Sequence, residues 1–206
     1  MGVPILIMGE SGSGKSYSLR TLDPKTTAVF NVQGKPLPFR EASEFAQSRT
    51  KDMGLIRATL AKTDKRNIVI DDFGYCITDL YMRFGCGTDE RMRDQYEVYK
   101  RIAYEVYQTV NAVAELDDDT FVFFVMHTTQ ENGQTVPSTI GRLLNEKVNL
   151  LGMFTIVLLS YVQGEEYGFI ANGTPPAKTP PGMFASERVP NDMGAIEKTA
   201  REYWGL

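Results

Sequence analysis

The sequence is poor in the residues that form disulfides, metal centres and membrane spans. Its 206 residues include one histidine and two cysteines, Cys76 and Cys86, which show no paired motif. We therefore expect reduced thiols in an intracellular protein rather than a disulfide framework or a cysteine metal site. No apolar run approaches the ~20 residues of a membrane helix, and no charged leader precedes the first apolar segment. These absences predict a cytoplasmic protein with no membrane partner.

An excess of positive charge is also missing, because 22 Lys and Arg residues stand against 26 Asp and Glu residues. A chain with a net charge of −4 can bind nucleic acid only through a local basic patch, weakly and in a salt-sensitive way. The sequence contains neither internal repeats nor low-complexity tracts. Its hydrophobic content of 42% is ordinary for a globular protein, and its length is enough for one domain with a buried core.

Apolar segments alternate with helical patterns, which predicts an α/β fold with a mainly parallel central sheet flanked by helices. The predicted strands span 5–8, 27–32, 67–71, 120–126 and 154–159, with 165–170 as an antiparallel hairpin partner near the C-terminus. The predicted helices span 15–22, the second half of 45–63, 91–116, 139–148 and 191–204, while the proline-rich stretch 173–182 is expected to be irregular. In such sheets ligands bind beyond the carboxyl ends of the strands.

The segment GESGSGKS follows the first apolar run and matches G-x-x-x-x-G-K-[ST] at every position. We expect the glycines Gly9, Gly12 and Gly14 to adopt positive φ angles and to turn backbone amides toward a phosphate. The motif predicts that Lys15 reaches the β- and γ-phosphates of ATP and that Ser16 binds Mg²⁺. The predicted nucleotide-binding residues are Gly9, Glu10, Ser11, Gly12, Ser13, Gly14, Lys15, Ser16 and Tyr17.

A second acidic position accompanies such loops on a neighbouring strand. The segment NIVIDDF ends its apolar run at Asp71, which is the predicted partner of Ser16 in holding Mg²⁺. Asp72 follows, and we expect it to polarise the attacking water, although aspartate is shorter than the glutamate that many ATPases use. The pair therefore predicts a hydrolytic site.

Two further residues are predicted to contact the γ-phosphate. His127 follows the apolar run FVFFVM, at the carboxyl end of a predicted central strand. RecA-type and helicase-type ATPases place a polar sensor residue there, and Thr128 and Thr129 are neighbours able to share the role. Lys178 lies among prolines in AKTPPGMF, and a lysine on such a rigid loop suits a group that completes the site of a neighbouring subunit.

Taken in order, GESGSGKS, NVQGKPLPF, NIVIDDF, FVFFVMHTT, AKTPPGMF and VPNDMGAIEKTAREYW resemble the phage-encoded AAA/RecA-like ATPases, a group that includes the Sak-type single-strand annealing proteins. The resemblance implies one RecA-like P-loop ATPase domain over residues 1–206, with ATP and Mg²⁺ as cofactors. It also implies a homo-oligomer that acts on single-stranded DNA in recombination or replication. A phage or host single-strand binding protein is then a partner, and the location is the cytoplasm of the host cell.

The sequence departs from that group at the position of the RecA glutamate base. The corresponding stretch reads Phe30-Asn31-Val32-Gln33 and contains no acid. Gln33 can orient water but cannot take its proton. Hydrolysis is therefore expected to be slow or to rely on Asp72.

Two other functions stay open at this point. A small-molecule or nucleotide kinase would clamp the transferred phosphate with arginines in a late, lid-like segment, whereas the late cations of this chain are scattered. The other possible function is that of an interaction module gated by ATP, with negligible turnover.

Predicted contacts to single-stranded DNA fall in two segments. The first is basic, contains glycine and carries an aromatic ring for base stacking, with Arg83, Phe84, Arg91 and Arg93 as candidates. The second spans 130–142, a polar stretch after the predicted sensor strand that includes Arg142. The tyrosines at positions 96, 99, 104 and 107 are instead predicted to pack inside their helix.

Overall fold

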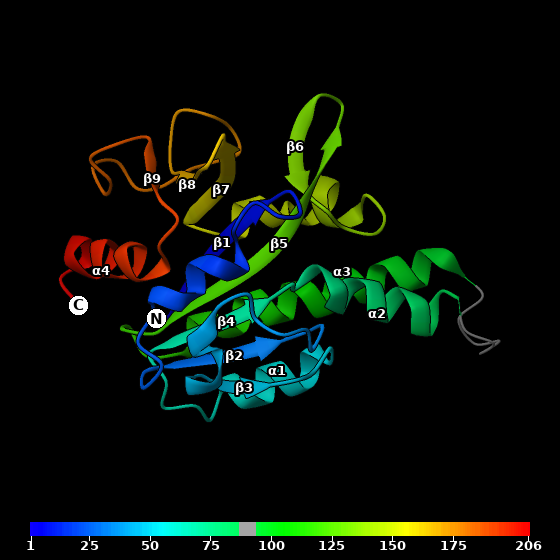
Figure 1. Cartoon of the computed structure of the whole chain (residues 1–206). Helices are drawn as coiled ribbons and strands as arrows, with labels where there is room; N and C mark the ends of the chain where they lie inside the picture. The colour runs from blue at the N-terminus through cyan, green and yellow to red at the C-terminus, as the bar shows by residue number, and fades with distance from the viewer. Residues whose placement is uncertain (87–93) are drawn as a thin grey trace.

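The computed structural model describes residues 1–86 and 94–206 and has the mostly parallel α/β architecture that the sequence predicts (Figure 1). The strands are β1 (Val3–Gly9), β2 (Thr27–Asn31), β3 (Ala46–Ser48), β4 (Asn67–Asp71), β5 (Phe121–Glu131), β6 (Gln134–Pro137), β7 (Ile156–Gln163), β8 (Glu166–Ile170) and β9 (Arg188–Pro190). The α-helices are α1 (Met53–Leu60), α2 (Gly74–Phe84), α3 (Gln95–Asn111) and α4 (Met193–Trp204). Short 3₁₀ or π-helical turns cover Ser16–Thr21 (η1), Arg40–Glu44 (η2), Ala112–Glu115 (η4), Leu144–Val148 (η5) and Leu150–Met153 (η6).

The sheet order in the described part is β3-β2-β4-β5-β1-β7-β8-β9. The strands from β3 to β7 in that order all run parallel, so their carboxyl ends share one edge of the sheet. Strands β8 and β9 are antiparallel additions, as predicted for the C-terminal hairpin. Strand β5 lies between β1 and β4 and continues past the sheet edge to pair with β6 as a projecting hairpin (Figure 1).

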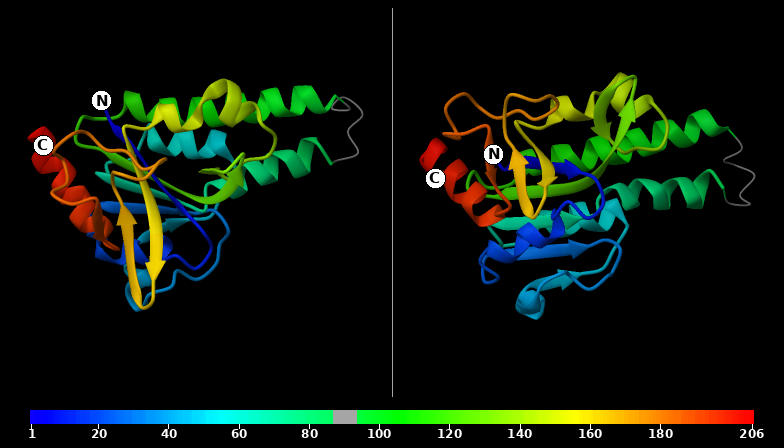
Figure 2. Two further views of the ribbon diagram at one scale, coloured as in Figure 1. Left: turned by 90° about the horizontal axis from the view of Figure 1, so that it is seen from above. Right: turned by 45° about the horizontal axis from the view of Figure 1, so that its top comes forward.

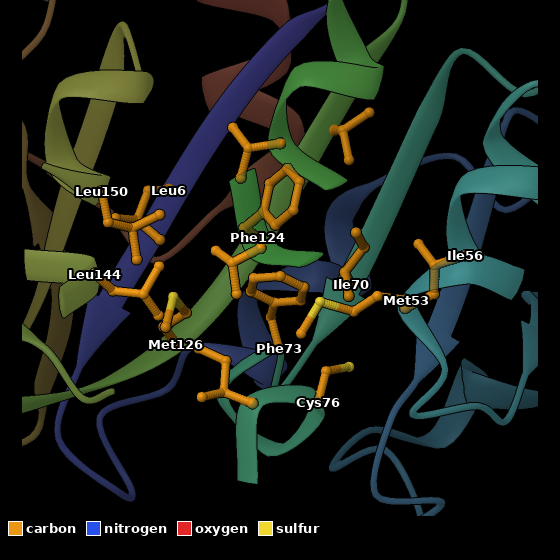
Figure 3. Packing of buried hydrophobic residues seen from close by; sticks show 14 of the residues in the cluster. Leu6, Met53, Ile56, Ile70, Phe73, Cys76, Phe124, Met126, Leu144 and Leu150 are labelled. Atoms are coloured by element: carbon orange, nitrogen blue, oxygen red, sulfur yellow. The ribbon is translucent and has the colours of Figure 1, made fainter. Parts of the chain in front are cut away.

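Alternating side chains of the central strands build a core on each face of the sheet. On one face, Leu6, Ile70 and Phe124 pack against α1, α2 and α3, and Phe73 meets Phe124 edge to face with ring centroids 5.1 Å apart (Figure 3). On the other face, the residues that alternate with these along the same strands pack against η1 and α4, and they include Ile5, Val69 and Phe123. This burial on both sides explains why the central strands read as continuous apolar runs.

Helices α2 and α3 lie side by side and extend beyond the sheet in all three views (Figures 1 and 2). Tyr81 of α2 and Tyr99 of α3 stack with centroids 6.2 Å apart. Helix α3 begins after Asp94, whose side chain accepts a hydrogen bond from the amide of Tyr96. Of the predicted helix 91–116, residues 91–93 lie outside the described residues.

The tyrosine prediction was wrong for most of the helix. Val98, Ile102, Val106 and Val110 form the buried face of α3, and tyrosines at positions 96, 104 and 107 fall outside it in the helical repeat. These three side chains are 59%, 59% and 45% exposed, and Tyr99 alone of the four packs against the core.

Other boundaries also differ from the predictions. The predicted helix 15–22 is the 3₁₀ segment η1, which ends before Asp23-Pro24, where proline disfavours a helical conformation of the preceding residue. The stretch 130–142 is partly a β-hairpin rather than a loop. Strands β3 and β9 and helix α2 were not predicted. No helix in the described residues has the length and apolar character that crossing a membrane requires.

Candidate functional site

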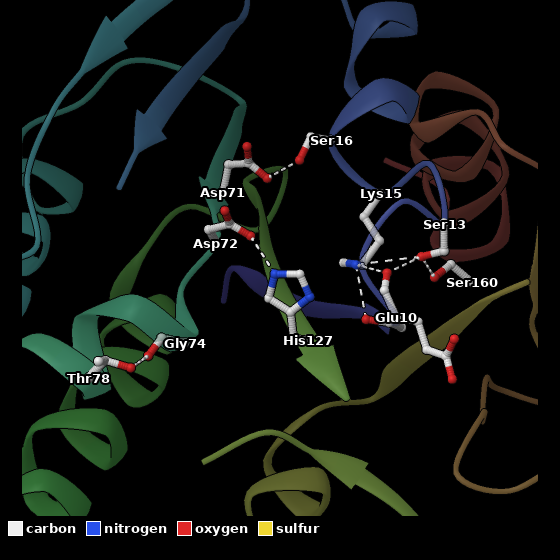
Figure 4. A network of polar contacts seen from close by, with 11 residues as sticks. Glu10, Ser13, Lys15, Ser16, Asp71, Asp72, Gly74, Thr78, His127 and Ser160 are labelled. Atoms are coloured by element: carbon white, nitrogen blue, oxygen red, sulfur yellow. Dashed lines mark hydrogen bonds and ion pairs between the residues drawn. The ribbon is translucent and has the colours of Figure 1, made fainter. Parts of the chain in front are cut away.

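Three strands bring the predicted site residues to one edge of the sheet (Figure 4). Gly9, the last residue of β1, is the register partner of His127 in β5. Asp71 ends β4, which pairs with the other side of β5. The position of β5 between β1 and β4 therefore places His127 between the GESGSGKS loop and the two aspartates.

The glycines of the loop serve two different purposes. Gly12 and Gly14 have φ angles of 79° and 84°, so the predicted left-handed conformations are confirmed there. The prediction was wrong for Gly9, which has no positive φ angle. Instead, a Cβ atom at Gly9 would lie 1.8 Å from Oγ of Ser160 on β7. The missing side chain of Gly9 therefore leaves room for the hydroxyl of Ser160 in its present position.

Ser160 was not predicted, and it connects the loop to β7. Its hydroxyl lies 2.6 Å from Oγ of Ser13 and donates to the carbonyl of Met8 at 3.2 Å. The two hydroxyl oxygens and the carbonyl oxygen are all buried, so these contacts attach the loop to strand β7. A serine in an apolar strand carries no sequence signal that points to this contact.

The ammonium of Lys15 lies inside the loop. Nζ donates to the carbonyl oxygens of Gly9 at 3.0 Å and Glu10 at 2.6 Å, and the residue is 5% exposed. Burial lowers the pKa of Lys15, while the carboxylates of Asp72 and Asp71 oppose that shift. A buried cation held by carbonyl oxygens is well suited to exchange these partners for phosphate oxygens.

Ser16 and Asp71 are in direct contact. Oγ of Ser16 donates to Oδ1 of Asp71 at 2.8 Å. Burial raises the pKa of Asp71 to about 6, although the hydrogen bond from Ser16 acts in the opposite direction. The described residues contain no cluster of three or more His, Cys, Asp or Glu that would hold a metal by themselves. The pair fits Mg²⁺ that takes its other ligands from phosphate and water.

Asp72 and His127 form the second polar pair. Nε2 of His127 lies 3.3 Å from Oδ1 of Asp72, and its other ring nitrogen faces the side of Lys15 (Figure 4). The hydrogen bond with His127 lowers the pKa of Asp72, and the charges of Lys35 and Lys15 add to the effect. Asp72 also has a φ angle of 62°, a strained conformation for a residue other than glycine.

Lys15, Ser16, Asp72 and His127 line one cavity of about 810 Å³, and Asp71, which does not line it, is hydrogen-bonded to Ser16 of its wall. Its walls come from the loop (Ser11, Gly12, Ser13, Gly14, Lys15, Ser16), from the acidic end (Lys35, Pro38, Asp72, His127) and from the opposite end (Tyr17, Arg20, Glu165, Tyr167, Pro190, Asn191, Asp192). The sequence reasoning missed Arg20, Lys35, Tyr167 and Asn191. The last two come from segments about 150 residues or more beyond the loop, and no local motif marks them.

The predicted nucleotide-binding, metal and catalytic residues that do not line this cavity are Gly9, Glu10, Gln33, Asp71 and Lys178. Gln33 follows β2 and is half-buried outside the cavity wall. The backbone of Lys178 pairs with that of Val157 in β7, on the side of β7 that faces away from β1. Since Leu6 of β1 is the partner of Val157, the backbone of Lys178 lies level with the middle of β1 rather than with the loop. Its predicted role in a neighbouring subunit stays a prediction.

The predicted DNA contacts are spread over the surface and do not line the cavity. Arg83 forms an ion pair with Asp79 at 2.7 Å, and the guanidinium of Arg101 lies 4.0 Å from the ring centroid of Phe84. Arg142 is 80% exposed and follows the β5–β6 hairpin. Arg91 and Arg93 lie outside the described residues.

No protein-family model matches the chain, and a search of curated proteins finds no significant match.

Proposed function

We propose that the chain is a single RecA-like P-loop domain that binds ATP with Mg²⁺ and hydrolyses it slowly. One observation carries the proposal: the loop with its buried Lys15, Ser16 with its partner Asp71, and the Asp72–His127 pair lie together at one cavity. Each pair joins residues from different elements, since Ser16 begins η1, Asp71 ends β4, Asp72 follows β4 and His127 lies in β5.

The loop supplies the phosphate contacts. Backbone amides around Gly12 and Gly14 are free to turn toward the β-phosphate. Lys15 would exchange its carbonyl partners for β- and γ-oxygens, and Lys35 adds a second cation at the acidic end of the cavity. Ser16 and Asp71 would hold Mg²⁺, which neutralises charge on the phosphates.

The acidic end supplies the hydrolytic step. A water oxygen attacks the γ-phosphorus, the bond from that phosphorus to the bridging oxygen breaks, and ADP leaves with the bonding electrons. Asp72 orients the imidazole of His127. The ring nitrogen of His127 that faces Lys15 accepts the proton of the water or contacts the γ-phosphate. Because the pKa of Asp72 is lowered, its carboxylate is a weak base, and the imidazole of His127 takes the proton in its place.

The cations of the cavity favour hydrolysis over kinase activity. Arg20 is the one arginine among the lining residues, and it is bound to carbonyl oxygens of Tyr17 at 2.9 Å and Asn191 at 3.2 Å. These contacts hold it at the end opposite Asp72. The lining residues therefore offer no arginine clamp for a phosphate in transfer.

Action on single-stranded DNA in annealing or replication, as a homo-oligomer, is the finer part of the proposal. It is supported by the sequence resemblance, and the candidate residues Arg83, Phe84 and Arg142 are the points at which to test it. An ATP-gated module without turnover is the alternative that a turnover assay separates.

The experiment measures ATP binding and phosphate release for the wild type, Lys15→Ala and Lys62→Ala, an exposed lysine outside the cavity as control. Lys15→Ala is expected to lose ATP binding by at least about 100-fold, because a cation at the phosphates is removed. Tight ATP binding by this variant would overturn the proposal.

The same assay separates the alternatives. Turnover that requires an added nucleoside monophosphate would indicate a kinase. Nucleotide-dependent assembly without turnover would indicate the module. Stimulation by single-stranded DNA that declines with rising salt would support the DNA role.

A further inference from the structure

The end of the cavity opposite Asp72 is lined by aromatic side chains. Resting on the proposed binding of a nucleoside triphosphate by the loop, we infer that Tyr17 and Tyr167 hold the purine base by stacking. This base subsite is built from η1, β8 and the segment before α4, and Tyr167, Arg20 and Asn191 were not recognised from the sequence.

The sheet order gives the direction of the bound nucleotide. Asp72 and His127 lie on the β4–β5 side of β1, whereas Tyr167 and Asn191 lie on the β7–β8–β9 side. Lys15 and Ser16 stand between these two ends of one cavity. A triphosphate whose terminal phosphate meets the Asp72 end therefore extends its sugar and base toward Tyr167.

Both tyrosines present ring surface there. Tyr17 is 44% exposed and Tyr167 is 47% exposed, and both line the cavity. The guanidinium of Arg20 lies 3.9 Å from the ring centroid of Tyr17 and supports that ring from one side. Exposed aromatic faces at the end of a phosphate-binding cavity are the groups on which a base stacks.

Tyr167 and Asn191 lie directly against the phosphate loop. A Cβ atom at Gly14 would stand 3.1 Å from Cδ1 of Tyr167 and 2.9 Å from Nδ2 of Asn191. Nδ2 of Asn191 donates to the carbonyl of Gly14 at 3.1 Å. The aromatic wall therefore begins where the loop ends, within reach of a base attached to loop-bound phosphates.

Asn191 and Asp192, two of the polar groups beside these rings, are already engaged within the protein. Asn191 bonds to Gly14 and Arg20, and Asp192 accepts a hydrogen bond from the amide of Ala195 at the start of α4. Stacking reads the face of a base rather than its edge. The stacking rings thus favour the larger purines over pyrimidines.

Calorimetric titration with ATP, GTP, CTP and inorganic tripolyphosphate tests the subsite. Tyr17→Ala and Tyr167→Ala are expected to weaken ATP and GTP binding by about five- to 100-fold each, the usual effect of removing one stacking ring. Tripolyphosphate affinity should stay within about twofold of the wild type, since it has no base to stack. Tyr17→Phe and Tyr167→Phe should bind ATP like the wild type, and Tyr104→Ala, an exposed tyrosine outside the cavity, is the matched control.

Unchanged ATP affinity in both alanine variants would overturn the inference. Equal losses for ATP and tripolyphosphate would also overturn it, because the rings would then act through the loop. Failure of the proposed function has a different signature, which is retention of tripolyphosphate and ATP binding by Lys15→Ala.

Discussion

At the residue scale, Asp72 combines a strained backbone with a charge at the centre of the site. Its φ angle of 62° lies in the left-handed region, which asparagine tolerates better than most residues. Asp72→Asn should therefore keep the free energy of unfolding within about 1 kcal/mol of the wild type. Loss of the carboxylate that orients His127 should reduce kcat by about 10- to 100-fold with little change in ATP affinity.

Steady-state phosphate release and urea unfolding measure these two effects. Asp64→Asn, at an exposed position away from the cavity, controls for loss of a negative charge. An Asp72→Asn protein with wild-type kcat would show that the carboxylate has no role in the reaction.

Asp71 should make the ligand-free protein less stable as the pH rises. Its pKa is raised from 3.8 to about 6 in the fold, so the native state binds more protons than the unfolded state between those values. Stability contributed by the protonated carboxyl is complete below about pH 4 and is lost as pH rises through about 6, a loss of about 3 kcal/mol.

Asp71→Asn removes this titration. Without Mg²⁺ and nucleotide, the variant should gain stability relative to the wild type as pH rises from 4.5 to 7, by about 2 kcal/mol. Urea unfolding of both proteins at several pH values measures the difference. A difference that is constant with pH would contradict the prediction.

The local motifs predicted that the loop and the two aspartates lie at the same edge of the sheet, and the structure places them there. Lys35, Ser160, Tyr167 and Asn191 were missed since each reaches the site through tertiary structure. His127 was predicted from its place after an apolar run, and the structure brings it beside Asp72. Gln33 shows the limit of this reasoning, because a position after a strand does not fix where a side chain lies.

At the element scale, the end of β1 fits against β7 because Gly9 has no side chain where the hydroxyl of Ser160 lies. Gly9→Ala would force Ser160 to move, since the new Cβ atom falls 1.8 Å from its Oγ. We expect a loss of about 1–3 kcal/mol in the free energy of unfolding, typical of overpacking in a core. Ser160→Ala removes the clashing oxygen and should recover part of that loss in the double variant.

A double-mutant cycle by urea unfolding gives the coupling between the two positions. Coupling of at least about 0.5 kcal/mol is expected for residues in contact. Strictly additive effects would mean that Ser160 is not the group that excludes a side chain at Gly9.

The secondary structure was predictable where a strand is buried on both faces or where a helix begins after a capping residue. Strand β4 and helix α4, capped by Asp192, follow their patterns. Helix α2 directly follows the acidic strand end, and its buried residues Cys76, Ile77 and Leu80 are too few to give a strong helical period. Strands β3 and β9, of three residues each, have no recognisable sequence period.

At the scale of the whole molecule, Lys178 tests whether the site is shared between subunits. It does not line the cavity of its own chain, so a catalytic role requires a neighbour. Lys178→Ala and Lys15→Ala should each be inactive, and an equal mixture should restore about a quarter of the sites by random assembly. ATPase measurement on an assembly shown to contain both variants checks this, and no recovery would contradict the shared site.

The architecture as a whole followed from alternating apolar and helical segments, which specify a mainly parallel sheet with helices on its faces. The strand order could not be predicted, because no local sequence pattern indicates that β5 lies between β1 and β4. That placement is a property of long-range pairing, and it sets the distance of every site residue from the loop.

If the proposed function holds, the crowding of Lys15, Asp71 and Asp72 would link the lifetime of the protein inside a cell to its nucleotide supply. The site brings a desolvated ammonium, a buried carboxyl and a strained backbone to one edge of the sheet. A ligand that neutralises these charges stabilises the native state by mass action. Proteases that cleave locally opened chains would therefore degrade the unliganded protein first, so energy-depleted cells would accumulate less of it.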